Sequence, residues 1–313
     1  MTLRRVLFAT DLSAYAGAVV DCLGGLRHFG VREVVLLHVV DQALGYVEGA
    51  AGFDLIGQLK ADARRGLAEV SGRLEERGFT VRTRLEVGVP AREIARVAEE
   101  EDASLIVVGA LGRTLLGGAL LGSVAERVLH LAQRPVLIER PRVLAELGSA
   151  ECRRRGEQTF ARVLLPTDFS PPSAVAARFV AGLRDAGLQE VVVLHVLEEG
   201  GPRGWRRPRS AGRIPRGAEV RLQEMVSALV GQGVRARGRL ERGAPADTII
   251  RVAGEENVGS IVMGSRGRGM VAELLLGSVA ERVARRSEGP VVIVPARVAW
   301  VQNEGNEMRG GEQ

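Results

Sequence analysis

Residues 105–128 read LIVVGALGRTLLGGALLGSVAERV, and residues 261–283 read IVMGSRGRGMVAELLLGSVAERV. Each stretch begins with a short apolar run typical of a buried strand and ends in a pattern typical of an amphipathic helix. Glycines separate the two, and a glycine-serine pair begins the helical pattern. A strand that leads through a loop into a helix is the building unit of an α/β fold. Because the unit occurs twice, the chain contains an internal repeat.

The repeat extends over both halves of the 313-residue chain. VLFATDLS at Val6 matches VLLPTDFS at Val163, and VVLLHVVD at Val34 matches VVVLHVLE at Val191, in both cases 157 residues further on. A repeat of this length is too long for a solenoid, so we predict two homologous domains of about 150 residues each. The predicted boundaries are a first domain over 1–143, a linker over 144–159, a second domain over 160–297 and a flexible tail over 298–313.

Within each half, short runs rich in β-branched residues alternate with helical patterns. Residues 34–39 and 105–109 are apolar on both faces, as expected for strands of a parallel sheet that helices cover on both sides. Alternating strands and helices with right-handed crossovers predict a doubly wound α/β domain. In the first half we expect strands over 4–9, 33–39, 80–86, 104–109 and 136–139 and helices over 14–28, 54–77, 91–101 and 123–133, and the second half repeats this series.

The composition is that of an ordinary soluble globular protein, with 46% hydrophobic and 26% charged residues. No apolar run approaches the roughly 18 residues that a membrane span requires, and the N-terminal segment runs straight into a predicted strand without a signal peptide. Cys22 and Cys152 lie far apart and near no cluster of His or Cys, which gives neither a disulfide framework nor a metal-binding spacing. We therefore expect a cytoplasmic protein that binds no membrane.

The net charge of +5 has a local source, because residues 203–216 contain six arginines and no acid. The segment is rich in proline and glycine and lacks periodicity, so it is predicted to be a mobile loop. A basic loop can bind nucleic acid electrostatically. Aromatic residues, however, make up only 4% of the chain, which argues against a stacking platform for bases. Nucleic acid is the less favoured partner.

Ligands of open α/β sheets bind at the carboxyl ends of strands where the winding reverses, and the informative residues here follow predicted strands. Asp11 and Asp168 come directly after the first strand of each half. Val40 and Leu197 end the second strand. Each aspartate has two candidate roles, as a ligand-binding carboxylate or as a cap of the helix that follows, and one carboxylate can do both.

The two glycine loops share one spacing: glycine, two residues, glycine, nine residues, then glycine-serine. Glycine permits positive φ and close approach of a ligand to the backbone, and the unpaired N–H groups at a helix start favour an anion by about 0.3–1 kcal/mol. The serines are predicted to cap the helix or to donate to a phosphate oxygen. The alternative, that the glycines only make tight turns, is weakened by the shared spacing. The candidate residues are Gly109, Gly112, Arg113, Gly122, Ser123 and Val124 in the first half and Gly264, Gly267, Arg268, Gly277, Ser278 and Val279 in the second.

Other nucleotide motifs do not fit the sequence. It contains no GxxxxGK[ST], and Lys60 is its only lysine, so a P-loop is excluded. Neither first strand is followed by GxGxxG, which disfavours a Rossmann dinucleotide site. His38 and His195 lie inside apolar strands and read as buried structural residues rather than catalysts, and no serine–histidine–acid set is suggested.

With these motifs the chain resembles the universal stress proteins, in a tandem form with two domains in one polypeptide. The family's motif G-2x-G-9x-G-[ST] matches both glycine loops, and its first-strand aspartate matches Asp11 and Asp168. Its second-strand His-Val pair matches the pairs that begin at His38 and His195. The resemblance covers about residues 3–140 and 161–296. It implies five parallel strands per domain in the order 3-2-1-4-5, a fold similar to that of the adenine-nucleotide α-hydrolases.

Resemblance to the ATP-binding subgroup implies ATP as ligand, with Mg²⁺. The adenosine would lie near Asp11 and Val40, or Asp168 and Leu197, and the phosphates on the glycine loops. It also implies pairing of the fifth strands, RPVLIER and GPVVIVPAR, which would join the two domains within one chain and hide two sheet edges; a homodimer is the alternative assembly.

The function implied is a stress-response or regulatory role with at most weak ATP hydrolysis, since the sequence shows no P-loop lysine and no evident general base. A protein-interaction module of the same fold that binds no nucleotide is the alternative, and a nucleotide-transforming enzyme stays open because related folds host such chemistry. The first loop reads GALGRT where the second reads GSRGRG, and this loss of a polar residue is expected to weaken the first site.

Overall fold

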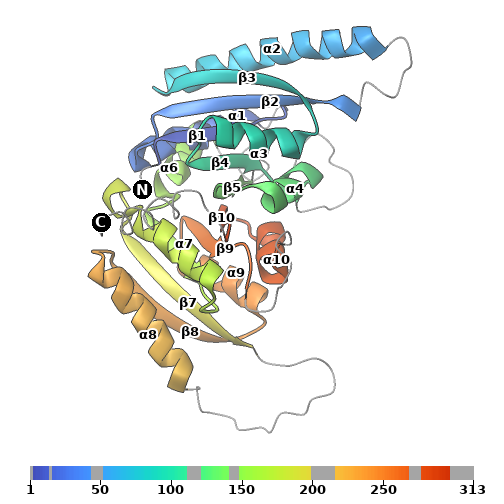
Figure 1. The fold of residues 1–313 in the computed structure, drawn as a ribbon. Coiled ribbons are helices and arrows are strands. Elements are labelled where there is room, and N and C mark those ends of the chain that lie inside the picture. The colour runs from blue at the N-terminus through green and yellow to red at the C-terminus, as the bar shows by residue number, and fades with distance from the viewer. Residues whose placement is uncertain are drawn as a thin grey trace, which may run out of the picture.

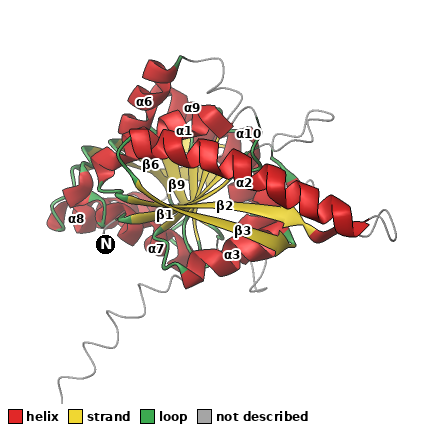
Figure 2. Cartoon of the chain, turned by 90° about the horizontal axis from the view of Figure 1, so that it is seen from above, coloured by secondary structure: helices red, strands yellow, loops and turns green. Residues whose placement is uncertain are grey.

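Ten strands form a single sheet in the order β3-β2-β1-β4-β5-β10-β9-β6-β7-β8, with helices on both faces (Figures 1 and 2). The structure is a computed structural model, and it describes residues 3–13, 16–43, 52–110, 121–140, 148–198, 216–267 and 276–296, with the backbone alone at 52–55 and 216. The predicted tail and the Arg-rich loop as far as residue 215 lie outside the described residues.

The first domain has the predicted topology, with its five strands parallel in the order 3-2-1-4-5. Its first helix is shorter than expected, because after Gly25 the chain tightens into a 3₁₀ turn, Leu26–Phe29. The strands are β1 (Arg5–Ala9), β2 (Glu33–Asp41), β3 (Thr80–Gly88), β4 (Leu105–Gly109) and β5 (Val136–Glu139), and the helices are α1 (Ala16–Gly25), α2 (Gly52–Glu76), α3 (Pro90–Glu100) and α4 (Ser123–Leu131).

The second domain repeats this arrangement, again with parallel strands in the order 3-2-1-4-5, so the predicted fold class is confirmed. Its strands are β6 (Arg162–Pro166), β7 (Glu190–Glu198), β8 (Ala236–Gly243), β9 (Ser260–Gly264) and β10 (Val291–Val294). Its helices are α7 (Pro171–Ala181), the 3₁₀ turn Arg184–Ala186, α8 (Arg216–Gly231), α9 (Pro245–Glu255) and α10 (Ser278–Arg286).

The two domains join where β5 and β10 pair antiparallel, as the resemblance implied, with Leu137 opposite Val292 and Ile138 opposite Val291. These residues are fully buried. Successive side chains of a strand point to opposite faces of the sheet, so Leu137 belongs to the core under α1, α2, α6 (Ser149–Gln158), α7 and α8, and Ile138 to the core under α3, α4, α9 and α10. Both cores run across the seam without a break.

Helix α6 (Ser149–Gln158) lies within the residues predicted as linker, and the sequence analysis did not foresee it. It packs on α1 through glycines of both helices, Gly25 and Gly156, so that the backbones approach closely. At this crossing the Cys22 thiol donates to the carbonyl oxygen of Cys152, 3.1 Å away. The domain boundaries at 143 and 160 stay predictions, but the segment between them includes an ordered helix.

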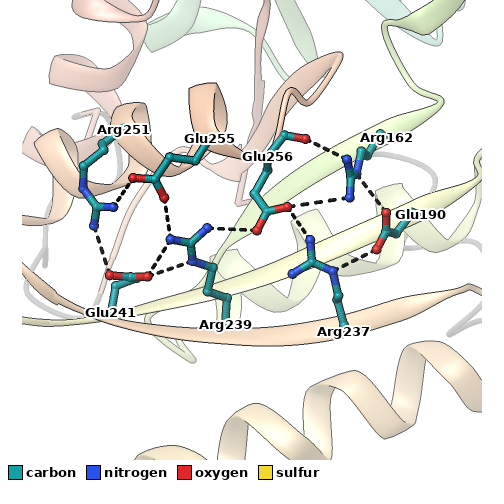
Figure 3. Close-up of polar contacts among 8 residues, drawn as sticks. All are labelled: Arg162, Glu190, Arg237, Arg239, Glu241, Arg251, Glu255 and Glu256. Atoms are coloured by element: carbon teal, nitrogen blue, oxygen red, sulfur yellow. Dashed lines mark hydrogen bonds and ion pairs between the residues drawn. The ribbon is translucent and has the colours of Figure 1, made fainter.

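Arginine and glutamate side chains form ion-pair networks beside both outer strands of the sheet. In the second domain Arg239 of β8 lies 2.7 Å from Glu241 and 2.9 Å from Glu256 (Figure 3), and in the first domain Arg84 of β3 lies 2.7 Å from Glu86 and from Glu101. Charged side chains on an edge strand disfavour pairing with another chain. The network in Figure 3 joins Arg162, Glu190, Arg237, Arg239, Glu241, Arg251, Glu255 and Glu256.

We predict that Gly156→Ala destabilises the protein, because a Cβ at this position would overlap the carbonyl oxygen of Cys22 on α1. Such overpacking typically lowers the free energy of unfolding by about 1–3 kcal/mol. Gly72→Ala is the matched control: Gly72 is also helical, a Cβ there meets nothing within 4 Å, and alanine is the better helix former by about 1 kcal/mol. Urea titration measures both. Equal stabilities for the two variants would contradict the packing of α6 on α1.

Glu139, the last residue of β5, is a carboxylic acid inside the protein, only 4% exposed. Burial raises the pKa of its carboxyl group from 4.5 to about 7. Between these two values the folded chain keeps a proton that the unfolded chain releases. The contribution of Glu139 to stability is therefore fully present below about pH 4.5 and is lost as the pH rises through 7.

We predict that Glu139→Gln is more stable than the parent at pH 8, by on the order of 1–3 kcal/mol. At this pH the carboxyl group of the parent is ionised inside the core, whereas the amide is neutral. At pH 4.5 the folded parent is protonated and so are about half of the unfolded chains, so the difference should shrink to a few tenths of a kcal/mol. Urea unfolding at the two pH values measures this. A difference that is the same at both would show that ionisation of Glu139 does not control stability.

Candidate functional site

The second domain contains a cavity of about 650 Å³ at the carboxyl ends of β6, β7 and β9. Small-molecule sites typically measure about 300–1,000 Å³, and this position is where the winding of the sheet reverses. The structure brings most of the predicted residues of this domain together here: Asp168, Leu197, Gly264, Gly267, Gly277, Ser278 and Val279 all line the cavity. Arg268 lies outside the described residues. Ligand binding by these residues stays a prediction.

A tight turn after β6 carries Asp168. The hydroxyl oxygen of Thr167 accepts from the backbone N–H of Phe169 at 2.9 Å, and Oδ1 of Asp168 accepts from the backbone N–H of Ser170 at 3.0 Å. Phe169 consequently has a φ of +62°, a left-handed conformation that costs a non-glycine residue about 1–2 kcal/mol. Asp168 does not cap α7; that role falls to Ser170. The aspartate is thus held by the turn, with its second oxygen 2.7 Å from where a Cβ on Gly267 would lie.

His195 of β7 stabilises this turn through a hydrogen bond to its backbone. Its Nδ1 lies 2.8 Å from the carbonyl oxygen of Thr167, and because a carbonyl only accepts, Nδ1 carries the proton. The imidazole also lies against the ring of Phe169, with the ring centres 4.4 Å apart. His38 makes the same 2.8 Å contact with the carbonyl oxygen of Thr10. Both histidines thus make a structural contact, but they are only half-buried, and His195 also lines the cavity.

The glycine loop of each domain is closed at its base by one backbone hydrogen bond. In the second domain the N–H of Gly277 donates to the carbonyl oxygen of Ser265 at 2.8 Å, and in the first the N–H of Gly122 donates to that of Ala110 at 2.5 Å. The end of the fourth strand and the start of the following helix are therefore held side by side. This arrangement places the helix N-terminus at the cavity whatever path the intervening residues take.

Glycine is needed at different positions of the second loop for different physical reasons. A Cβ on Gly264 would lie 2.7 Å from the carbonyl oxygen of Pro172, so this glycine lets α7 pack on the end of β9, a reason other than the ligand approach expected for it. A Cβ on Gly277 would meet nothing closer than 3.3 Å, and its φ of −67° and ψ of 142° suit any residue. Gly277 therefore has no packing reason as strong as that of Gly264, which leaves room for a ligand as the reason.

The prediction that Ser123 and Ser278 cap their helices is wrong. The N-cap residues are Gly122 and Gly277, with extended backbones, and no side chain caps either helix. Each serine is instead the first residue of its helix and is exposed. The other predicted role, donation of the hydroxyl to an anion at the helix start, stays available.

Sequence reasoning missed several residues of the cavity. Arg266, partly buried at the base of the loop, brings a positive charge, and Ile249 of α9 with Met263 of β9 supplies apolar wall. The motif could not identify the apolar pair, because they belong to different elements and have ordinary core spacing. For Arg266 there was a signal: the second loop reads GSRGRG, whereas Leu111 stands at the equivalent place in GALGRT.

The first domain has its candidate residues at the ends of the equivalent strands and at the start of the equivalent helix. Asp11, Val40, Gly109, Gly122, Ser123 and Val124 are described, whereas Gly112 and Arg113 lie outside the described residues. Oδ1 of Asp11 accepts from the backbone N–H of Ser13 at 3.0 Å. Its Oδ2 is buried and has no hydrogen-bond partner among the described residues. A buried carboxylate oxygen without a partner is unusual in a folded protein and calls for a donor.

Two further classes of site were sought in the described part of the chain. It holds no group of three or more His, Cys, Asp or Glu side chains placed to bind a metal ion. Among the same residues, no helix combines the length and the apolar character that crossing a bilayer requires.

We predict that His195→Phe lowers the free energy of unfolding by about 1 kcal/mol, because the carbonyl oxygen of Thr167 loses its donor while the ring against Phe169 remains. His28→Phe is the control, since His28 is an exposed histidine whose replacement should change stability by less than about 0.5 kcal/mol. Urea unfolding of both variants decides; if His195→Phe is as stable as the control, the hydrogen bond does not hold the turn.

Comparison with known proteins gives a consistent result. The profile of the universal stress protein family matches residues 2–140 and 159–295. A universal stress protein of Mycolicibacterium smegmatis is 31% identical over 309 residues, which cover 93% of this chain and 97% of the relative. One from Methanocaldococcus jannaschii is 30% identical over 151 residues, 43% of this chain and 93% of the relative. The crystal structure of a universal stress protein from Archaeoglobus fulgidus has a TM-score of 0.71 at 28% identity and covers 95% of this chain and 100% of its own.

Proposed function

The chain belongs to the universal stress protein family, with two tandem domains of that family, and we propose that it binds ATP in the cavity of its second domain. One observation carries the proposal: a glycine loop, a helix start and an aspartate converge on a single cavity at the switch point of the sheet. The role that follows is regulatory, in the stress response, with nucleotide occupancy changing the stability of the protein or its choice of partner.

The lining of the cavity divides into parts that suit the parts of a nucleotide. Leu197, Ile249 and Met263 offer an apolar wall for the adenine. The carboxylate of Asp168 is an acceptor for a ribose hydroxyl. The backbone N–H groups at the start of α10 and the guanidinium of Arg266 are donors for phosphate oxygens, and both interactions are favoured by charge.

We extend the proposal to the first domain, where a ribose hydroxyl would give the buried Oδ2 of Asp11 the donor that it lacks among the described residues. Weaker binding is expected there, because Leu111 takes the place of Arg266 in the sequence and carries no charge. The two sites of one chain would then fill at different ATP concentrations.

Hydrolysis of the bound ATP is proposed to be slow. The chain's residues bind and orient the nucleotide, and His195 already uses its Nδ1–H to hold the turn that carries Asp168. A Mg²⁺ ion would arrive with the phosphates and neutralise part of their charge, since the described residues offer no cluster of metal ligands of their own. The proposed location is the cytoplasm, where ATP is abundant.

Calorimetric titration of the full chain with Mg-ATP tests the proposal, and binding is the expected result. Gly277→Val should remove the second site, because its side chain would press on the backbone at Arg266 and Gly267, which line the cavity, while the backbone angles at position 277 accommodate valine. Gly122→Val is the matched variant in the first domain and should remove only the weaker site. Thermal unfolding of the ligand-free variants checks that both fold.

Two results would count against ATP binding. One is the absence of both heat and thermal shift at millimolar ATP, which would leave an interaction module of the same fold. The other is unchanged affinity in Gly277→Val, which would place the nucleotide away from the loop.

A further inference from the structure

A residue of the first domain contacts the glycine loop of the second. His130 is the second-last residue of α4, and its Nδ1 accepts a hydrogen bond from the backbone N–H of Leu276 at 3.3 Å. Leu276 directly precedes Gly277, the N-cap of α10. Helices α4 and α10 lie side by side across the seam between the domains (Figure 1). The contact therefore links one domain to the candidate phosphate site of the other.

Two successive backbone N–H groups at the end of this loop are thus fixed by different domains. The N–H of Gly277 bonds to Ser265 of its own domain, and the N–H of Leu276 bonds to His130 of the other. The side chain of Leu276 is buried in the core beneath α10. Together these contacts set the direction in which the chain enters α10. They therefore also set the direction in which the N–H groups at the helix start point.

Among the described residues, no equivalent contact runs from the second domain to the loop of the first. Helices α4 and α10 have the sequences SVAERVLHL and SVAERVARR, so Arg285 occupies in α10 the place of His130 in α4. A guanidinium has five donors and no acceptor, and cannot accept a backbone N–H. Arg285 instead bonds to Glu126 of α4, 2.8 Å away, and to Glu281 of its own helix at 3.0 Å.

We propose that His130 is a positioning residue for the nucleotide site of the second domain, so that the first domain completes the site of its neighbour. The inference rests on the proposed ATP binding. His130 acts through Leu276 and touches no ligand. Its role requires the lone pair on Nδ1, which exists only when the imidazole is neutral and its proton is on Nε2.

Two substitutions at His130 distinguish the effect of the Nδ1 lone pair from the effect of the shape of the side chain, and a third substitution serves as a control. His130→Phe keeps the ring and removes the acceptor. His130→Asn removes the ring, but its Oδ1 stands at the place of Nδ1 along the side chain and can accept the same N–H. Arg285→Gln is the control at the equivalent position of α10, where the side chain bonds to Glu126 and Glu281.

The test is titration of the full chain with Mg-ATP in an Asp11→Ala background, which removes the ribose acceptor of the first site without altering α4. We expect ATP to bind about five- to tenfold more weakly to His130→Phe, the effect of one hydrogen bond. His130→Asn and Arg285→Gln should stay within about twofold of the background protein. Equal affinity of the Phe and background proteins would overturn the proposal, and so would a loss in the Asn variant as large as in Phe, since packing would then explain it.

Amide hydrogen exchange of the ligand-free protein gives a readout that does not depend on ATP. The backbone N–H of Leu276 should exchange on the order of tenfold faster in His130→Phe and return to the parent rate in His130→Asn. If the parent fails to bind ATP, the proposed function fails while this experiment still reports on the contact. If the parent binds ATP but Leu276 exchanges at one rate in all variants, the positioning role of His130 is refuted.

Discussion

The antiparallel pairing of β5 with β10 is the interaction on which the rest of the molecule depends. Each strand is short and buried, and apolar except for Glu139 at the end of β5, and neither could end a sheet in water without exposing its backbone groups. Their pairing turns two five-stranded sheets into one and continues the core on both faces. It also brings α4 beside α10 (Figure 1), so that the glycine loop of the second domain ends at a helix of the first.

Backbone hydrogen bonds fix two parts of the candidate site, the turn that carries the aspartate and the two ends of the glycine loop. The turn that carries the aspartate is strained in both domains, with φ at +56° for Leu12 and +62° for Phe169. Strain of this kind persists only where surrounding contacts hold it, and here a buried threonine and a histidine from the neighbouring strand do so. The glycine loop is held at its two ends. A ligand would meet a fixed carboxylate on one side and a helix start of fixed position on the other.

Much of the fold could be predicted from the sequence, because the apolar runs, their spacing and the internal repeat are local signals. Helix α6 could not, since its residues SAECRRRGEQ have no apolar face and its place depends on the contact between Gly156 and Gly25. In the site, the motif found the residues that share one loop, but Ile249 and Met263 come together only in three dimensions. The helix caps were misassigned because a glycine with extended backbone precedes each serine.

The seam has a consequence for how the two halves can change. In a symmetric dimer of identical subunits every substitution appears on both sides of the interface, so each contact occurs twice, related by the two-fold axis. A single chain encodes the two sides separately and holds them together at an effective concentration that dilution does not alter. Histidine at position 130 and arginine at position 285 show the result: equivalent positions of the two halves carry different residues and make different contacts across the interface.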